Sequence, residues 1–252
     1  MMMLWVAIMA VGLVGMIVCS KKQKSNPAMQ PLAIVLFIVV LVGAGGLLNN
    51  MGIFGGANNS ILESEMRFAE SRAVALAKFV APTASGKKVL FIADQNFGQG
   101  DLGKRVLEAV KANCKAANFV VDSIPVPPEM ANNGVPVEEF MKAKDLDALI
   151  EKHSDAAVVI SNIGLPQDAR KLAFFRKAAD KRPMLALMNT GFAMNYDFLK
   201  GIKKGDVAAV IVTAPKAKYD IKAPSNLDEA FKIRYLLVTK DNADQHKDQL
   251  PR

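Results

Sequence analysis

Two long uncharged stretches near the N-terminus constrain this chain more than any other feature. Residues Met1–Cys19 form one unbroken apolar run, and Pro31–Leu48 form another. Each is close to the roughly 20 residues that an α-helix needs to cross ~30 Å of hydrocarbon. Backbone polar groups in lipid must be satisfied within the chain, so both runs are predicted to be helical. The short polar segment between them allows only a tight turn, which predicts a transmembrane hairpin over residues 1–48.

The charges beside the two spans predict their orientation. The turn carries Lys21, Lys22 and Lys24, whereas the N-terminus carries no basic side chain. The positive-inside rule therefore places the Lys21–Lys24 turn in the cytoplasm. We expect an integral protein of a bacterial inner membrane, with both termini and the following domain outside the cytoplasm, in the periplasm. The first span lacks the basic start and the small-residue cleavage site of a signal peptide.

Small residues recur in both spans, among them Gly12, Gly15 and Gly43. Small side chains allow helices to approach closely in lipid. Two interpretations are open: these residues pack within the hairpin, or they pack against other membrane subunits. The expected partners are the lipid bilayer, other membrane subunits contacting the hairpin, and a second copy of the chain.

A linker and a long helix are predicted after the hairpin, over residues 49–82. Asn49–Asn59 is rich in Gly and Asn, which is typical of a flexible segment. Ser60 and Glu63 form a capping box, and the helix that they begin is expected to end near Ala81, before Pro82. Its apolar positions follow a heptad-like spacing: Leu62, Met66, Ala69, Ala73, Leu76 and Val80. This stalk helix either docks on its own domain or meets a partner or second copy.

Strand and helix patterns alternate over residues 83–242. Continuous apolar runs predict strands at 88–93, 119–124, 156–161, 184–188, 207–212 and 235–239. Amphipathic patterns predict helices at 102–114, 137–152, 168–179 and 196–202. This alternation predicts a Rossmann-like α/β domain with a doubly wound, mainly parallel sheet, followed by a polar tail at 243–252. Two long connections, 125–136 and 214–226, are candidates for partner contacts.

Polar residues follow the predicted strands at their carboxyl ends, where open α/β sheets bind ligands. The candidate ligand-binding residues of this rim are Asp94, Gln95, Asn96, Ser161, Asn162, Asn189, Thr190 and Thr213. They could hydrogen-bond a small polar ligand. The same residue types are also common in ordinary turns, so a purely structural role is the alternative.

A GxGxxG motif, formed by Gly98, Gly100 and Gly103, lies between the first strand and the first helix of this domain. Asp122 follows about twenty residues later, as in a dinucleotide-binding fingerprint. Glycines at this spacing let a backbone approach a pyrophosphate at a helix N-terminus. However, Asp101 adds a negative charge to the loop, and a periplasmic domain would lack free dinucleotide. No cofactor is expected on this basis.

Patterns for other chemistry are weak. His153 is expected to be a surface residue, and neither it nor His246 has a Cys, Asp or Glu set at metal-ligand spacing. No GxSxG elbow is present to activate a serine. Tyr196 and Lys200 form YxxxK, but the order and spacing do not fit short-chain dehydrogenases. No catalytic or metal-binding residue is predicted.

One stretch resembles a known family. Within residues 87–190, a strand is followed by DQNFGQGD, a long helix and a second strand, and the DAAVVIS and RPMLALMN strands come later. This order resembles one lobe of a type I periplasmic binding protein. The resemblance implies a sugar-like or other small polar ligand at the strand ends. Such proteins close two lobes over the ligand, whereas this stretch corresponds to one.

The sequence leaves three functional hypotheses. The favoured one is a non-catalytic accessory or structural subunit of a bacterial membrane complex. The alternatives are a membrane-tethered module that binds or senses a small ligand, and a nucleotide-dependent oxidoreductase using the glycine loop. The predicted cytoplasmic turn is too short to be a signalling domain, which favours the first over a sensor. The modest positive charge beyond residue 60, without basic runs and interleaved aromatics, gives no indication of nucleic-acid binding.

Overall fold

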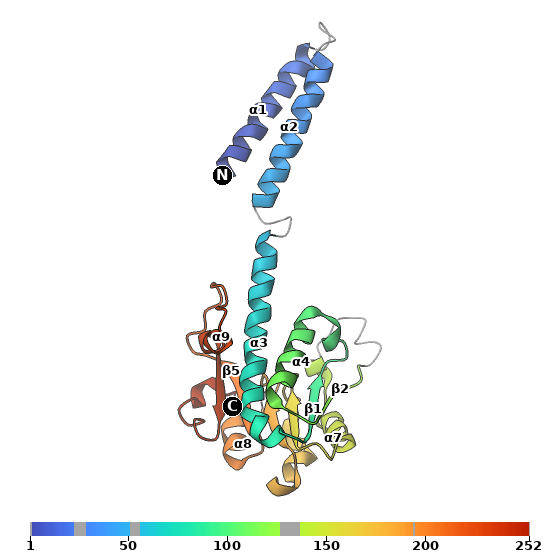
Figure 1. The fold of residues 1–252 in the computed structure, drawn as a ribbon, viewed down its shortest axis with the longest axis vertical. Helices are drawn as coiled ribbons and strands as arrows, with labels where there is room; N and C mark the ends of the chain where they lie inside the picture. The colour runs from blue at the N-terminus through green and yellow to red at the C-terminus, as the bar shows by residue number, and fades with distance from the viewer. Residues whose placement is uncertain (1, 23–28, 51–55, 127–136, 194, 252) are drawn as a thin grey trace. The chain divides into compact units, whose positions relative to one another are not determined.

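The computed structural model describes residues 2–22, 29–50, 56–126, 137–193 and 195–251 (Figure 1). The chain divides into two compact units, Met1–Ser64 and Glu65–Arg252. The division falls inside the long helix α3 (Gly56–Ala84). Most of the predicted 125–136 connection lies outside the described residues, as do Lys24 and residues 51–55 of the predicted linker.

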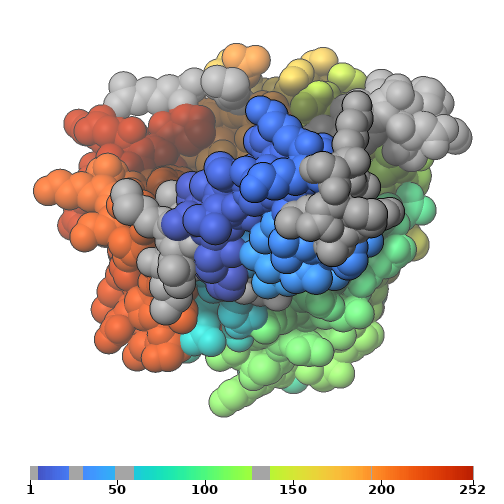
Figure 2. Space-filling view, turned by 90° about the horizontal axis from the view of Figure 1, so that it is seen from above, coloured from blue at the N-terminus to red at the C-terminus, as the bar shows by residue number. Residues whose placement is uncertain are grey.

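The first unit is a hairpin of two helices, α1 (Met2–Lys22) and α2 (Met29–Asn50). Figure 2 shows them from above as neighbouring dark-blue and lighter-blue regions. A Cβ atom added to Gly12 would lie 2.6 Å from a side-chain carbon of Val40. One added to Gly46 would meet the ring of Trp5 at the same distance. The small residues therefore let the two helices pack against each other, which is the first of the two predicted roles.

Both hairpin helices are long and apolar enough to cross a membrane. The stretches Trp5–Lys22 and Pro31–Leu48 have mean hydropathies of 1.6 and 2.7. Most of their large aliphatic side chains are exposed on the outer faces of the hairpin. An apolar surface of this kind has a favourable environment in a lipid bilayer.

Helix α3 is longer than predicted, because it begins at Gly56 and continues through Pro82. Pro82 lies in the last turn, where it removes a single helical hydrogen bond, and the Ser85 N–H closes that turn on the Ala81 carbonyl. From residue 65 onward, the predicted heptad seam packs into the core of its own unit. Its buried members are Ala69, Ala73, Leu76 and Val80.

The second unit is a six-stranded sheet covered on both faces, in the strand order β2-β1-β3-β4-β5-β6. Five strands are parallel and the last is antiparallel to β5. The strands are β1 (Lys88–Ala93), β2 (Asn118–Ser123), β3 (Val158–Ser161), β4 (Met184–Leu187), β5 (Ala209–Thr213) and β6 (Tyr235–Thr239). The predicted α/β class with a mainly parallel sheet is confirmed.

Two apolar layers sandwich the sheet. One contains α3, α4 (Asp101–Cys114) and part of α9 (Leu227–Arg234). The other contains α6 (Val137–Phe140), α7 (Ala143–Lys152), α8 (Phe198–Lys204) and a segment of short 3-10 turns. The predicted polar tail contributes Ala243 and Leu250 to this second layer.

The sequence wrongly predicted a helix over 168–179. The chain instead forms three 3-10 turns, η2 (Ala169–Lys171), η3 (Ala173–Arg176) and η4 (Ala179–Lys181). Asp147 of α7 accepts hydrogen bonds from the N–H groups of Ala173 and Phe174 at 2.8 and 2.9 Å. These tertiary bonds fix the start of η3 to α7. The sequence patterns also did not predict the short helix α9 (Leu227–Arg234).

The predicted helix over 137–152 is interrupted between α6 and α7. The Lys142 N–H bonds to the carboxylate of Asp145, and the Ala143 N–H bonds to that of Asp168. These carboxylates satisfy N–H groups at a helix start, so a new helix begins at Ala143.

Arg234 is a buried cation that ties α3 to the C-terminal part of the sheet. Only 1% of its side chain is exposed. It donates to the carboxylate of Glu65 at 2.6 Å and to the carbonyl of Lys218 at 2.9 Å. Its guanidinium carbon lies 3.4 Å from the ring centroid of Phe68. The 214–226 connection and the α3 helix are thus held by one side chain.

We expect Arg234→Ala to lower the free energy of unfolding of the second unit by about 3 kcal/mol, because it removes buried hydrogen bonds and leaves a cavity. Pulse proteolysis of the full chain in detergent, at increasing urea concentration, measures the effect. Lys232→Ala, at an exposed position of the same helix, is the control. Equal stability of the two variants would show that the buried cation is dispensable.

Candidate ligand-binding site at the strand ends

The first three rim residues form a self-contained turn after β1. The Asn96 N–H donates to the carboxylate of Asp94 at 2.9 Å, and the side-chain amide of Gln99 donates to Asn96 Oδ1 at 3.0 Å. Gln95 lies between them and is exposed. Asp94 and Asn96 therefore stabilise their own loop.

Ser161 and Asn189 hold the loops that follow β3 and β4. The fully buried Ser161 hydroxyl donates to the carbonyl of Gly164 at 2.7 Å. The Asn189 side chain donates to the carbonyl of Asn162 and accepts from the Gly191 N–H. Gly164 and Gly191 have φ values of 65° and 64°, a conformation that favours glycine. These predicted site residues have a structural role in joining the two loops.

The glycine loop also has a packing explanation. Gly98 lies in the 3-10 turn η1 (Phe97–Gln99), Gly100 is the N-cap of α4, and Gly103 lies in the first turn of that helix. A Cβ atom on Gly103 would collide with the Phe97 carbonyl. The Phe97 ring stacks on Phe91 with the centroids 5.9 Å apart. Gly103 thus allows the turn to close on the helix.

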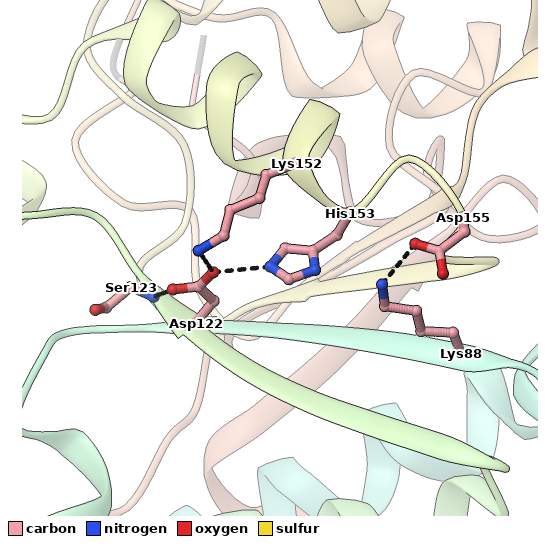
Figure 3. A network of polar contacts seen from close by, with 6 residues as sticks. All are labelled: Lys88, Asp122, Ser123, Lys152, His153 and Asp155. Atoms are coloured by element: carbon pink, nitrogen blue, oxygen red, sulfur yellow. Dashed lines mark hydrogen bonds and ion pairs between the residues drawn. The ribbon is translucent and has the colours of Figure 1, made fainter.

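Asp122, the acid of the proposed fingerprint, already has basic partners (Figure 3). Its carboxylate lies 2.7 Å from both Lys152 Nζ and His153 Nε2, and accepts from the Ser123 N–H at 2.8 Å. His153 is 9% exposed, so the expectation that it lies on the surface is wrong. Partial burial raises the pKa of Asp122, but hydrogen bonds from His153, Lys152 and Ser123 outweigh it and lower the pKa to about 2.

We expect this carboxylate to stabilise the fold at neutral pH and to lose its effect in acid. Its folded pKa lies below the ordinary value of 3.8, and solvent screens the exposed Lys152 partner, so its contribution is about 1 kcal/mol. That contribution is present above pH 4 and disappears as the pH falls toward 2. Asp122→Asn should lower stability at pH 7 and flatten this acid dependence. Urea unfolding from pH 2 to 7 measures both. The control is Asp180→Asn, at an exposed position. If the stability of Asp122→Asn depended on pH in the same way as that of the unaltered chain, the expectation would be contradicted.

Three predicted rim residues do come together, around a cavity of about 250 Å³ at the ends of β4 and β5. They are Asn189, Thr190 and Thr213. Sequence reasoning missed the other polar members of the wall, which are Arg72, Tyr235 and Gln249. Tyr235 begins β6 directly opposite Thr213, so the antiparallel strand brings it to the carboxyl end of β5.

Arg72 is the most unusual residue of this wall. Its guanidinium carbon lies 5.2 Å from the centroid of the Tyr235 ring, and its Nε is buried without a hydrogen-bond partner. Among the described residues, no carboxylate forms an ion pair with it. The buried Arg182 and Arg234, by contrast, pair with Asp206 and Glu65. Buried polar groups are normally satisfied, so the Nε–H of Arg72 is an unused donor in the wall of this cavity.

No family model matches the chain, and the comparison with curated proteins finds no match. Solved structures with a similar arrangement of strands and helices include two solute-binding proteins. One is an ABC transporter solute-binding protein from Bradyrhizobium sp. BTAi1 with bound bis-tris, at 12% identity and a TM-score of 0.44. The other is AraP, an arabinose-binding protein from Geobacillus stearothermophilus, at 17% identity and a TM-score of 0.43.

Each comparison covers 70% of this chain, and 52% and 62% of the respective neighbours. The chain therefore spans between half and two thirds of the length of these solute-binding proteins. The likeness lies in the arrangement of strands and helices.

Proposed function

We propose that this chain is a membrane-anchored binding protein whose second unit takes up a small organic anion at the ends of β4 and β5. Arg72 is the observation that carries this proposal, because it is a permanently charged side chain beside a cavity with no carboxylate partner in the described chain. A planar guanidinium binds a carboxylate through two parallel hydrogen bonds. The expected ligand therefore bears a carboxylate.

The rest of the wall suits a polar ligand of modest size. The hydroxyls of Thr190 and Thr213 and the amide of Gln249 make no hydrogen bond to any described residue, and all three line the cavity. Met188 and Ile211 supply apolar surface. The volume of about 250 Å³ is below the range of pockets for drug-sized molecules. A small hydroxylated or aminated carboxylate fits this chemistry.

Arg72→Gln should weaken carboxylate binding at least tenfold, because a charge-assisted pair is replaced by a neutral amide. Succinate, glutamate and lactate are the probes, with glycerol as a neutral comparison. Isothermal titration of the full chain in detergent measures each affinity. Lys78→Gln changes a cation on the same helix that pairs with Asp228 instead, and should leave binding unchanged. If no carboxylate binds the wild type, the proposed ligand class is wrong.

The proposal includes the predicted membrane arrangement. The two apolar helices anchor the chain, the turn that follows Lys21 and Lys22 faces the cytoplasm, and the second unit lies outside. The length and hydropathy of the spans support the anchor. Basic residues at the end of α1 support the orientation.

Alkaline phosphatase fused after Arg252 should be active in bacterial cells, and a green fluorescent protein fused there should be dark. Changing Lys21, Lys22 and Lys24 together to glutamate removes the orienting charge and should lower the phosphatase signal. The matched control changes Lys216, Lys218 and Lys222, which lie in the second unit. A fluorescent C-terminal fusion on the unaltered chain would refute the orientation.

The accessory-subunit hypothesis stays a second candidate. The exposed apolar outer faces of α1 and α2 favour it, since membrane subunits pack on such surfaces as readily as lipid does. Purification in mild detergent separates the two functions. Stoichiometric companion subunits would favour the accessory role, and a lone chain carrying a small carboxylate would favour the binding role.

A further inference from the structure

A second and larger cavity lies between η2–η3 and α8, away from the rim residues. Its volume is about 560 Å³. Four basic side chains line it: Arg170, Arg176, Lys200 and Lys204. They come from two segments that are distant in the sequence, so the fold has assembled this group of cations.

The two acidic residues of the wall neutralise these cations only in part. Asp206 is buried and pairs with Arg182 at 2.9 Å and with Lys204 at 3.4 Å. Asp197 caps α8, since its carboxylate accepts from the Lys200 backbone N–H at 2.9 Å. Among the described residues, the Lys200 side chain has no carboxylate within ion-pair distance.

Arg170 and Arg176 are likewise without an ion-pair partner among the described residues, and both are exposed at the mouth of the cavity. Together with Lys200, these exposed side chains give this side of the cavity a positive charge. Arginine pairs are well suited to phosphate, because their planar donors match its oxygens.

A buried hydroxyl without a partner lies in the same wall. Tyr196 is 6% exposed, and its Oη has no hydrogen-bond partner. The ring is held between Phe175 and Phe198, with centroids 5.2 and 5.0 Å away. The hydroxyl lies over Gly201, where any side chain would collide with it. Gly201 thus makes room for the hydroxyl beside the cavity.

The Tyr196 hydroxyl is a hydrogen-bond donor without an acceptor. Burial raises the pKa of the phenol, and the nearby carboxylate of Asp206 raises it further, so the hydroxyl keeps its proton at physiological pH. The Oη atom has almost no contact with solvent, so a ligand oxygen would satisfy it only by entering the space next to Gly201. The lost hydrogen bond of a buried polar group costs free energy, so a ligand that restores it gains affinity.

We propose that this cavity is a second binding site, specific for a phosphate group, in which Arg170, Arg176 and Lys200 neutralise the anion and Tyr196 donates to it. A phosphate has more charge and more acceptor oxygens than a carboxylate, and it matches several cations and a hydroxyl at once. The group could belong to a soluble phosphate ester or to an anionic phospholipid headgroup. The site stands independently of the carboxylate pocket.

The test uses the full chain in nanodiscs of phosphatidylcholine, titrated calorimetrically with inorganic phosphate. Saturable binding is expected for the wild type. Arg176→Gln with Lys200→Gln should weaken it at least tenfold, and Tyr196→Phe, which keeps the ring packing, should weaken it several-fold. Thermal unfolding of each variant confirms that it is folded.

Two controls make the test specific. Lys216→Gln with Lys218→Gln removes the same charge from an exposed connection and should leave phosphate binding intact. Arg72→Gln should also leave it intact, which separates this site from the carboxylate pocket. Equal weakening by the Lys216 and Lys218 pair would overturn the proposal, because binding would then follow net charge alone.

The two phosphate sources are distinguished by lipid analysis. If free phosphate does not bind, the chain is purified in mild detergent from bacterial membranes, and the retained phosphatidylglycerol is measured by mass spectrometry. Retention by the wild type and its loss in the Arg176 and Lys200 variant would assign the site to a headgroup. Absence of both phosphate binding and selective lipid retention would refute the site.

Discussion

Docking of α3 on the sheet is the interaction on which the second unit depends. Parallel strands need apolar cover on both faces, and Ala73, Leu76 and Val80 of α3 supply part of it. The same docking sets the rotation of the helix. That rotation directs Glu65 toward the buried Arg234 and brings Arg72 to the cavity at the strand ends.

The two candidate sites share one physical property, which is an unmatched polar group beside a cavity. Several polar side chains at the strand ends are already satisfied: Ser161 and Asn189 join loops, and Asp122 is held by Lys152 and His153. A ligand that binds such a group must replace an existing hydrogen bond, so the net gain in binding free energy is small. Arg72 and Tyr196 differ, because each has a buried polar atom without a partner.

Sequence patterns predicted the elements that are determined by the residues of the element itself. The apolar runs of β1 and β6 were predicted with their observed bounds. β1 is buried on both faces, which requires a continuously apolar strand, whereas β6 is a half-buried edge strand that its aromatic and aliphatic residues still favour. The prediction of a helix over 168–179 was wrong, because Asp147 of α7 accepts hydrogen bonds from the backbone N–H groups of Ala173 and Phe174. A one-dimensional pattern contains no information about that contact.

The sequence by itself determined the two apolar helices, the α/β class and the edge of the sheet where polar residues gather. Each of these follows from periodicity and chain length. Only the tertiary structure decided which polar residues form hydrogen bonds or ion pairs within the protein and which face a cavity. Arg72 and Thr213 are distant in the sequence, as are Arg170 and Lys200, and they line common walls because the packing of helices on the sheet sets their positions.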